Sequence, residues 1–247
     1  MIYERIQKGR FLKRPNRFIA KIEINGKEET VHVKNTGRCA ELLVPGAEVF
    51  VRKSESAGRK TGWDLISVRK ADRLINMDSQ VTNKVVQEWI EAGRWFKDVK
   101  IVRPEVTYKN SRFDLYVEYE EKKAFIEVKG VTLEEEGVVK FPDAPSERAV
   151  KHLKELEEAV QDGYEAYVFF VVQMKGVRYF TPNRRTHKEF ADVLAEAVET
   201  GVQVIAKDCF VTEDSIAIAD EVPVVLTNPQ LYEAPELLVE WYRERKR

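Results

Sequence analysis

Two short apolar runs near the middle of the chain, each carrying a carboxylate, constrain its fold more than any other feature. Residues 112–116 and 124–130 are separated by a charged turn, which predicts two neighbouring strands of a β-hairpin. Successive side chains of a strand alternate between faces, so Glu127 and Lys129 share a face. Asp114 precedes Glu127 by 13 residues. This separation is close to the one that sets two residues side by side across a short turn.

Two acids and a lysine in this arrangement form the residue set that metal-dependent phosphodiester cleavage uses. Mg²⁺ accepts carboxylate oxygens as ligands, polarises a phosphoryl oxygen and makes hydroxide from water. A lysine beside it orients that water or neutralises the developing charge. The alternative is a solvated hairpin face, because such a set recurs by accident in a chain that is 34% charged. The apolar neighbours favour covered strands, where a carboxylate needs a partner or a metal.

Charge is divided unevenly along the chain. Residues 1–75 contain 17 Lys and Arg against 9 Asp and Glu, a net charge of +8, whereas residues 76–247 contain 24 against 33, a net charge of −9. A basic N-terminal module is typical of a protein that binds polyanions. The alternative, a highly charged surface without a ligand, would seldom divide so unevenly.

The basic module, residues 1–75, has the pattern of a small β-barrel. Strands are expected over residues 17–24, 30–33, 48–51 and 63–68. Short strands without a long helix favour the OB type of barrel, which commonly binds oligonucleotides. Phe18 and Trp63 add rings that could stack bases. For Phe18 a place in the barrel core is expected, and a stacking platform is the alternative. The side chains predicted to contact nucleic acid here are Arg17, Lys34, Asn35, Thr36, Arg38, Arg59 and Lys60.

Residues 76–226 predict an α/β domain with a mixed sheet flanked by helices. A helix is expected from a cap at Asp78 or Ser79 to Gly93, and another with Pro145 in its first turn. The apolar run 166–172 is typical of a buried central strand. A helix over residues 185–200 and a strand over 202–206 complete a β-α-β unit.

Two features of this domain and of the chain end leave alternatives open. Arg148, Lys151 and His152 share one helix face, which either is solvated or contacts phosphate. Residues 227–247 predict an amphipathic helix with a basic end, which covers the domain, mediates homodimers or adds a basic contact.

Other observations limit the class of protein. No run of eighteen apolar residues occurs, so no membrane span is expected. Cys39 and Cys209 are the two cysteines, a usage that favours a reduced, cytoplasmic protein over a disulfide scaffold.

A series of short motifs resembles one known family over about residues 1–226. The motifs are Arg17-Phe18, Asn35-Thr36-Gly37, Pro45-Gly46, Arg112-Phe113-Asp114, Glu127-Val128-Lys129, Thr132-Leu133, Phe141-Pro142-Asp143-Ala144, Arg148 and Lys151-His152-Leu153. They resemble the sugar fermentation stimulation protein A (SfsA) family. The resemblance implies an N-terminal OB-like domain, a C-terminal domain of the PD-(D/E)xK restriction-endonuclease-like fold, and DNA binding.

The resemblance also implies roles for individual residues. Asp114, Glu127 and Lys129 fall on the catalytic triad of the nuclease fold. Glu88 falls where related nucleases place an additional helix acid, and the carbonyl of Val128 is expected as a further metal ligand. The metal set is therefore Asp114, Glu127, Val128 and Glu88, and the expected cofactor is Mg²⁺ or Mn²⁺.

Three functions remain open from the sequence. The first is a Mg²⁺- or Mn²⁺-dependent deoxyribonuclease acting on single- or double-stranded DNA. The second is a DNA-binding transcriptional regulator of the sugar-metabolism type that has a nuclease scaffold without turnover. The third is a protein–protein adaptor that uses the C-terminal helix.

Overall fold

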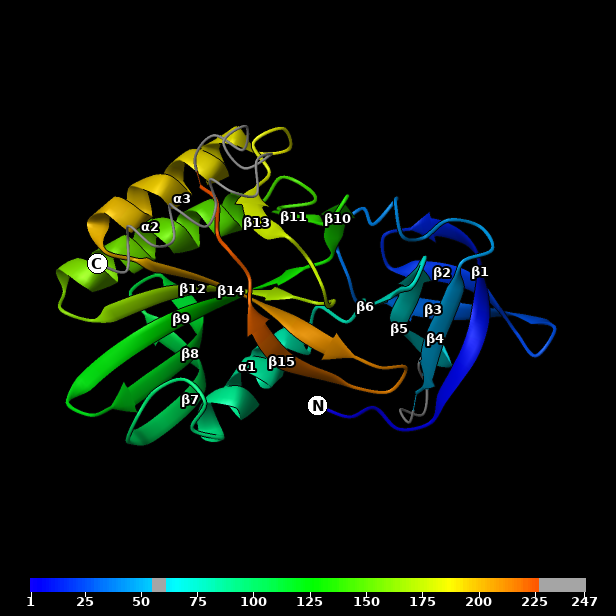
Figure 1. Ribbon diagram of the computed structural model, residues 1–247, viewed down its shortest axis with the longest axis horizontal. Coiled ribbons are helices and arrows are strands. Elements are labelled where there is room, and N and C mark those ends of the chain that lie inside the picture. The colour runs from blue at the N-terminus through cyan, green and yellow to red at the C-terminus, as the bar shows by residue number, and fades with distance from the viewer. Residues whose placement is uncertain (55–60, 227–247) are drawn as a thin grey trace.

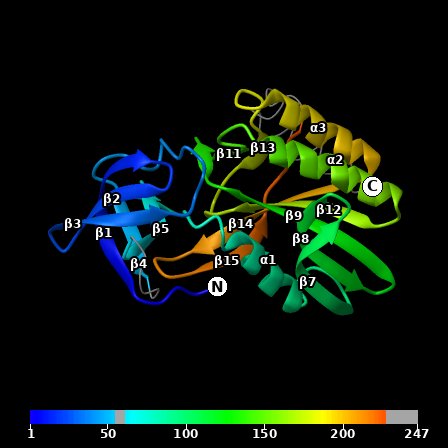
Figure 2. The same cartoon turned by 180° about the vertical axis from the view of Figure 1, so that it is seen from behind.

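The computed structural model describes residues 1–54 and 61–226. Arg59, Lys60 and the predicted helix over residues 227–247 lie outside the described residues. The described chain forms a barrel of strands beside a larger α/β part, and the two lie along the long axis of the molecule (Figure 1). The same arrangement is seen from behind in Figure 2.

Five strands close the N-terminal barrel. They are β1 (Ile6–Asn16), β2 (Ile19–Ile24), β3 (Lys27–Val33), β4 (Glu48–Lys53) and β5 (Trp63–Lys70). Neighbours pair in the cyclic order β1-β2-β3-β5-β4, and the parallel β3–β5 pair closes the ring. Alternate side chains of β2, among them Ala20 and Ile22, are buried in the barrel interior. This confirms the predicted OB barrel.

A mixed six-stranded sheet organises the second part. Its strands are β7 (Val99–Tyr108), β8 (Ser111–Tyr119), β9 (Lys122–Val131), β12 (Glu165–Val172), β14 (Gln203–Val211) and β15 (Ile216–Glu221). Their order is β15-β14-β12-β9-β8-β7, and β12 runs parallel to both β9 and β14. The predicted central strand and β-α-β unit are therefore confirmed.

Helices cover both faces of this sheet. α1 (Thr82–Glu91) packs Val85 and Val86 on the face that presents Leu115 and Ile126. On the opposite face lie α2 (Glu147–Gln161) and α3 (Lys188–Thr200), so the sheet stands between the two helix layers (Figure 1). Because each face of β8 and β9 meets a helix, carboxylates on these strands are held near a core.

The remaining strands are short. β6 (Arg73–Asn76) pairs with β5 and leads from the barrel towards α1. A separate sheet consists of β10 (Leu133–Glu135), β11 (Val138–Phe141) and β13 (Tyr179–Pro182). Among the described residues, no helix has the length and apolar character needed to span a membrane.

Three local predictions need correction. Helix α1 begins at Thr82 after an N-cap at Val81, because Ser79 instead donates its hydroxyl to the Lys34 carbonyl. Pro145 precedes α2, whose N-cap is Ser146; its side chain accepts the backbone N–H of Ala149. Phe18 is not in the barrel core: 51% of its surface is exposed, because it occupies the turn between β1 and β2.

Candidate metal and nucleic-acid site

The predicted acid pair lies on the β8–β9 hairpin, near the sheet end that faces the barrel. The antiparallel pairing of β8 with β9 runs as far as Leu115 and Ile126, so Asp114 and Glu127 are the residues directly beyond the last pair. The Asp114 carboxylate accepts the backbone N–H of Val128 at 2.8 Å and the side-chain amide of Asn83 at 2.7 Å. Burial and the charge of Glu127 raise the pKa of Asp114.

Glu127 is a buried, ionised carboxylate, and one of its two oxygens has no hydrogen-bond partner among the described residues. The residue is 2% exposed. Oε1 lies 2.5 Å from the Lys129 ammonium and also contacts Nδ1 of His152, whereas Oε2 has no hydrogen-bond partner among the described residues. Burial alone would raise the pKa of Glu127, but Lys129 and His152 outweigh burial and hold this pKa below its usual value.

The two carboxylates fit a divalent cation. A buried ionised oxygen without a partner is costly, and a metal ion is one of the few groups that relieve that cost. Asp114 adds a second hard oxygen donor near Glu127, close enough for the charge of Glu127 to raise its pKa, and such oxygens are the donors that Mg²⁺ and Mn²⁺ prefer. Val128 gives its N–H to Asp114, and the role of its carbonyl stays a prediction.

The structure does not bring Glu88 to this pair. Its Oε2 lies 2.8 Å from the amine of Met1, and its side chain is exposed. Glu88 follows Asn83 by five positions, which turns its side chain by about 140° around the helix axis. Asn83 is therefore the α1 side chain at Asp114, and sequence reasoning missed it because an amide in a first helix turn has no distinctive spacing.

The predicted face of α2 divides into a buried and an exposed part. His152 is 4% exposed, and its ring lies between Glu127 and Arg148, whose Nε donates to Nε2 at 3.4 Å. Arg148 and Lys151 are exposed and line a pocket of about 450 Å³ beside the hairpin.

The barrel residues predicted to contact nucleic acid also divide. Lys34 is mostly buried between Asp64 and Asp78, at 3.3 and 3.4 Å, so this cation is already neutralised. Asn35 is buried and donates to the Thr132 hydroxyl at 3.4 Å. The predicted residues that remain exposed are Arg17, Thr36 and Arg38.

Arg14 organises these exposed residues, although the sequence analysis did not single it out. Its guanidinium donates to four backbone carbonyls, those of Arg17, Asn35, Gly37 and Arg38, at 2.5 to 3.0 Å. The β1–β2 turn and the loop after β3 are thereby held against each other. No signal in the sequence separates such an arginine from an ordinary surface cation.

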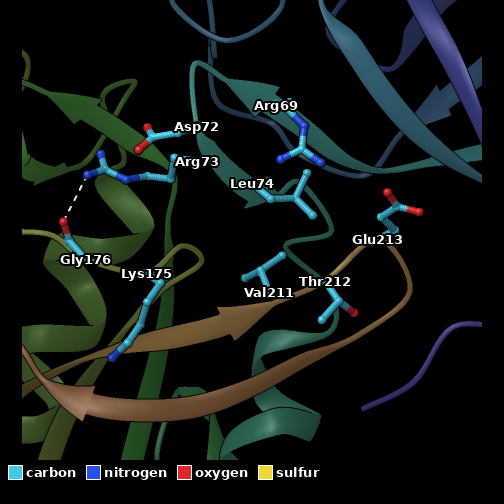
Figure 3. A pocket seen from close by; sticks show the side chains of 9 residues that line it. All are labelled: Arg69, Asp72, Arg73, Leu74, Lys175, Gly176, Val211, Thr212 and Glu213. Carbon is cyan, nitrogen blue, oxygen red and sulfur yellow. Dashed lines mark hydrogen bonds between the residues drawn. The ribbon is translucent and has the colours of Figure 1, made fainter.

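Two other groups of residues are less suited to binding a metal ion or a polyanion. Glu147, His187 and Glu189 have ligand atoms within 4.8 Å of one another. However, Nδ1 of His187 faces the Ser146 N–H, and Glu189 faces Lys154. A pocket of about 500 Å³ between barrel and sheet contains three cations (Figure 3). These cations are each paired, Arg69 with Glu48, Arg73 with Glu134 and Lys175 with Asp208.

Together, the closed barrel and the sheet with its acid pair define a class of two-part proteins, an OB barrel joined to a restriction-endonuclease-like domain. Family models agree: the "SfsA N-terminal OB domain" matches residues 12–77, and the "Sugar fermentation stimulation protein RE domain" matches residues 80–215. The chain belongs to the SfsA family.

Relatives of the chain carry the same family name. A "Sugar fermentation stimulation protein homolog" of Clostridium beijerinckii is 62% identical over 226 residues, which cover 92% of this chain and 100% of the relative. One of Desulfitobacterium hafniense is 60% identical, with 92% and 99% coverage. A solved structure, Pyrococcus furiosus SfsA in complex with Ca²⁺, matches with a TM-score of 0.80 and 26% identity, and covers 91% of this chain and 98% of that one.

Proposed function

We propose that this protein binds DNA and hydrolyses its phosphodiester backbone with Mg²⁺ or Mn²⁺ held by Asp114 and Glu127. The observation that carries the proposal is the unpartnered Oε2 of Glu127, a buried and ionised oxygen near a second carboxylate, Asp114. The Ca²⁺ complex of the related Pyrococcus furiosus protein supports a divalent ion in this family.

Each side chain of the site has a definite part in this chemistry. A divalent ion there supplies Lewis-acid polarisation of the phosphate and a more acidic water. Lys129 lies beside Glu127, where its ammonium neutralises charge that develops on the phosphate. His152 is a positioning residue on α2 that contacts Oε1 of the Glu127 carboxylate and so fixes its orientation. In this proposal Arg148 and Lys151, both exposed on α2, hold the DNA strand through its phosphates.

One observation favours a second function, that of a DNA-binding regulator without turnover. Lys129 is 2.5 Å from Glu127, so its ammonium already offsets part of the buried charge without a metal. A scaffold of this kind would bind DNA through the exposed cations and would be indifferent to divalent ions. The two functions share DNA binding and differ in cleavage.

The test scores binding and cleavage together. Labelled single- and double-stranded DNA is incubated with the protein in EDTA, Mg²⁺ or Mn²⁺, beside Glu127→Gln and the control Glu121→Gln. Glu121 lies in the turn of the same hairpin with a 95% exposed side chain, so its loss leaves the site intact. We expect cleavage that needs the metal and that disappears in Glu127→Gln, whereas binding persists in both variants.

Two outcomes would contradict the proposal. Cleavage that is unchanged in Glu127→Gln would come from another site or from a contaminant. Binding without cleavage under every condition would instead establish the regulator.

A further inference from the structure

An exposed aromatic ring marks the turn between β1 and β2. Phe18 leaves 51% of its surface in water. Burying a phenylalanine contributes about 1.5–3 kcal/mol, so a turn with no ligand gains nothing from this residue type. Aromatic rings are among the residue types that are enriched at binding surfaces.

The backbone around this ring is held on both sides. The Phe18 N–H donates to the side chain of Asn16 at 2.9 Å, and its carbonyl accepts the N–H of Val33 at 2.8 Å. Arg14 donates to the carbonyl of Arg17 at 2.7 Å. The ring is therefore presented from an ordered turn, which lowers the entropic cost of binding against it.

Cations flank the ring. Arg17 precedes it in the chain, and Arg38 is brought close because Arg14 binds the carbonyls of both arginines. Both side chains are exposed and form no ion pair with any residue that the structure describes. They contrast with Lys34 of the same loop, which is neutralised by two aspartates.

The same loop reaches the sheet that carries the acid pair. Asn35 contacts Thr132, the residue directly after β9, and the Cys39 N–H donates to Asp143 at 2.8 Å. A strand of nucleic acid that lies on the ring is thus led towards the hairpin of Glu127.

We propose that Phe18 is a stacking platform for an unpaired nucleobase of single-stranded DNA, with Arg17 and Arg38 on the adjacent phosphates. The inference rests on the proposed function, because it names the form of DNA that the site accepts. An aromatic face and nearby cations are the combination with which OB barrels hold single strands. In a duplex the base faces are covered by their neighbours, so a ring on the surface finds nothing to stack on.

The experiment measures affinity by fluorescence anisotropy in EDTA, where no cleavage interferes. The probes are an oligothymidine of about 15 nucleotides, within the site size of OB barrels, the same length built of abasic nucleotides, and a duplex. The variants are Phe18→Ala, Phe18→Leu and Phe18→Tyr. Phe210→Ala is the matched control, since this ring on β14 is also exposed, at 60%.

We expect Phe18→Ala and Phe18→Leu to weaken binding of oligothymidine about 10-fold, the loss of one stacked base. Phe18→Tyr and Phe210→Ala should bind as the wild type does, and the abasic strand should not distinguish the variants. Equal losses on thymidine and abasic strands would overturn the platform, as would a Phe18→Leu variant with full affinity. Tighter binding of oligouridine ribonucleotide with the same dependence on Phe18 would overturn the assignment to DNA.

Failure of this inference is distinguishable from failure of the proposed function. Wild-type protein that binds none of the DNA probes would remove both. Binding that ignores Phe18, together with cleavage that needs Glu127, would remove the platform and leave the nuclease.

Discussion

Asp114 and Glu127 belong to one site, yet their environments shift their pKa values in opposite directions. Burial and the neighbouring negative charge raise the pKa of Asp114. For Glu127, burial is outweighed by Lys129 and His152, and its pKa falls. At neutral pH the folded protein therefore stabilises the charge on Glu127 and opposes that on Asp114. A bound cation relieves this opposition, as expected of a site built for function rather than for stability.

This difference predicts the behaviour of Asp114→Asn. A carboxyl whose folded pKa lies above its unfolded pKa adds stability at low pH, and that stability is lost as pH rises through the folded pKa. In EDTA at neutral pH we expect a higher Tm for Asp114→Asn than for the wild type, and the gap should close below the ordinary pKa of 3.8. Thermal unfolding followed by circular dichroism checks this.

The same thermal unfolding experiment is repeated with a metal ion present. Adding Mn²⁺ should raise the Tm of the wild type more than that of Asp114→Asn, because the variant lacks one ligand. A variant that is less stable than the wild type in EDTA at neutral pH would show that Asp114 is instead stabilised by its bonds to Asn83 and Val128.

At the scale of elements, the loop after β3 joins the barrel to the sheet through a close contact at Gly37. A Cβ at this position would lie 2.8 Å from the carboxylate of Asp143 and 2.9 Å from the side-chain oxygen of Asn35. The same carboxylate holds the Cys39 N–H. A side chain at position 37 would therefore displace the Asp143 carboxylate or the Asn35 side chain, both of which form hydrogen bonds.

We predict that Gly37→Ala destabilises the protein by about 1–3 kcal/mol, the usual cost of an added methyl group in a packed contact. Urea unfolding measures the loss. Gly62→Ala is the control, because a Cβ there meets nothing within 4 Å. If the contact with Asp143 is the cause, Asp143→Ala should cost less in the Gly37→Ala background than alone, and additive losses would refute this explanation.

Strong alternation and turn signals made most elements predictable. The β8–β9 hairpin followed from two apolar runs around a charged turn, and the buried run of β12 identified the central strand. β7 was missed because it is an edge strand with exposed residues and a proline, Pro104, which an edge tolerates. β1 was missed for a similar reason, since most of its residues lie outside the core.

The candidate site was predictable as a pair of strands but not as a set of contacts. The hairpin follows from the two apolar runs, and its last pair, Leu115 with Ile126, lies directly beside Asp114 and Glu127. The positions of Asn83 and His152 depend on how α1 and α2 cross the sheet, and local sequence does not encode that geometry. Phe18 was assigned to the core because alternation continues through it, although the strand begins only at Ile19.

At the scale of the whole molecule, the charge asymmetry predicts how binding responds to salt. Proteins that contact 6–10 phosphates lose roughly 10³–10⁵ in affinity between about 50 and 200 mM salt. We expect a steep loss of this kind for DNA binding in EDTA. Arg17→Ala should reduce the slope of log Kd against log salt by about 1. Lys188→Ala should leave the slope unchanged, because Lys188 already pairs with Asp192. A flat salt response would contradict phosphate binding.

Contacts between the N-terminal part, residues 1–76, and the α/β part come from several separate segments. They join Tyr3 to Asp214, Lys70 to Glu134, Asn76 to Gln173 and Cys39 to Asp143. Contacts from segments that are distant in sequence oppose hinge motion, because opening at any one of them strains the others.

Because the two parts are attached at several points, the distance between Phe18 and Glu127 is fixed by the fold. If a base rests on Phe18 while the backbone reaches Glu127, the length of strand between them is set by the fold and not by a moving clamp. Cuts should then fall at a constant number of nucleotides from the base that is held. The product ladder of a long single strand would record that interval directly.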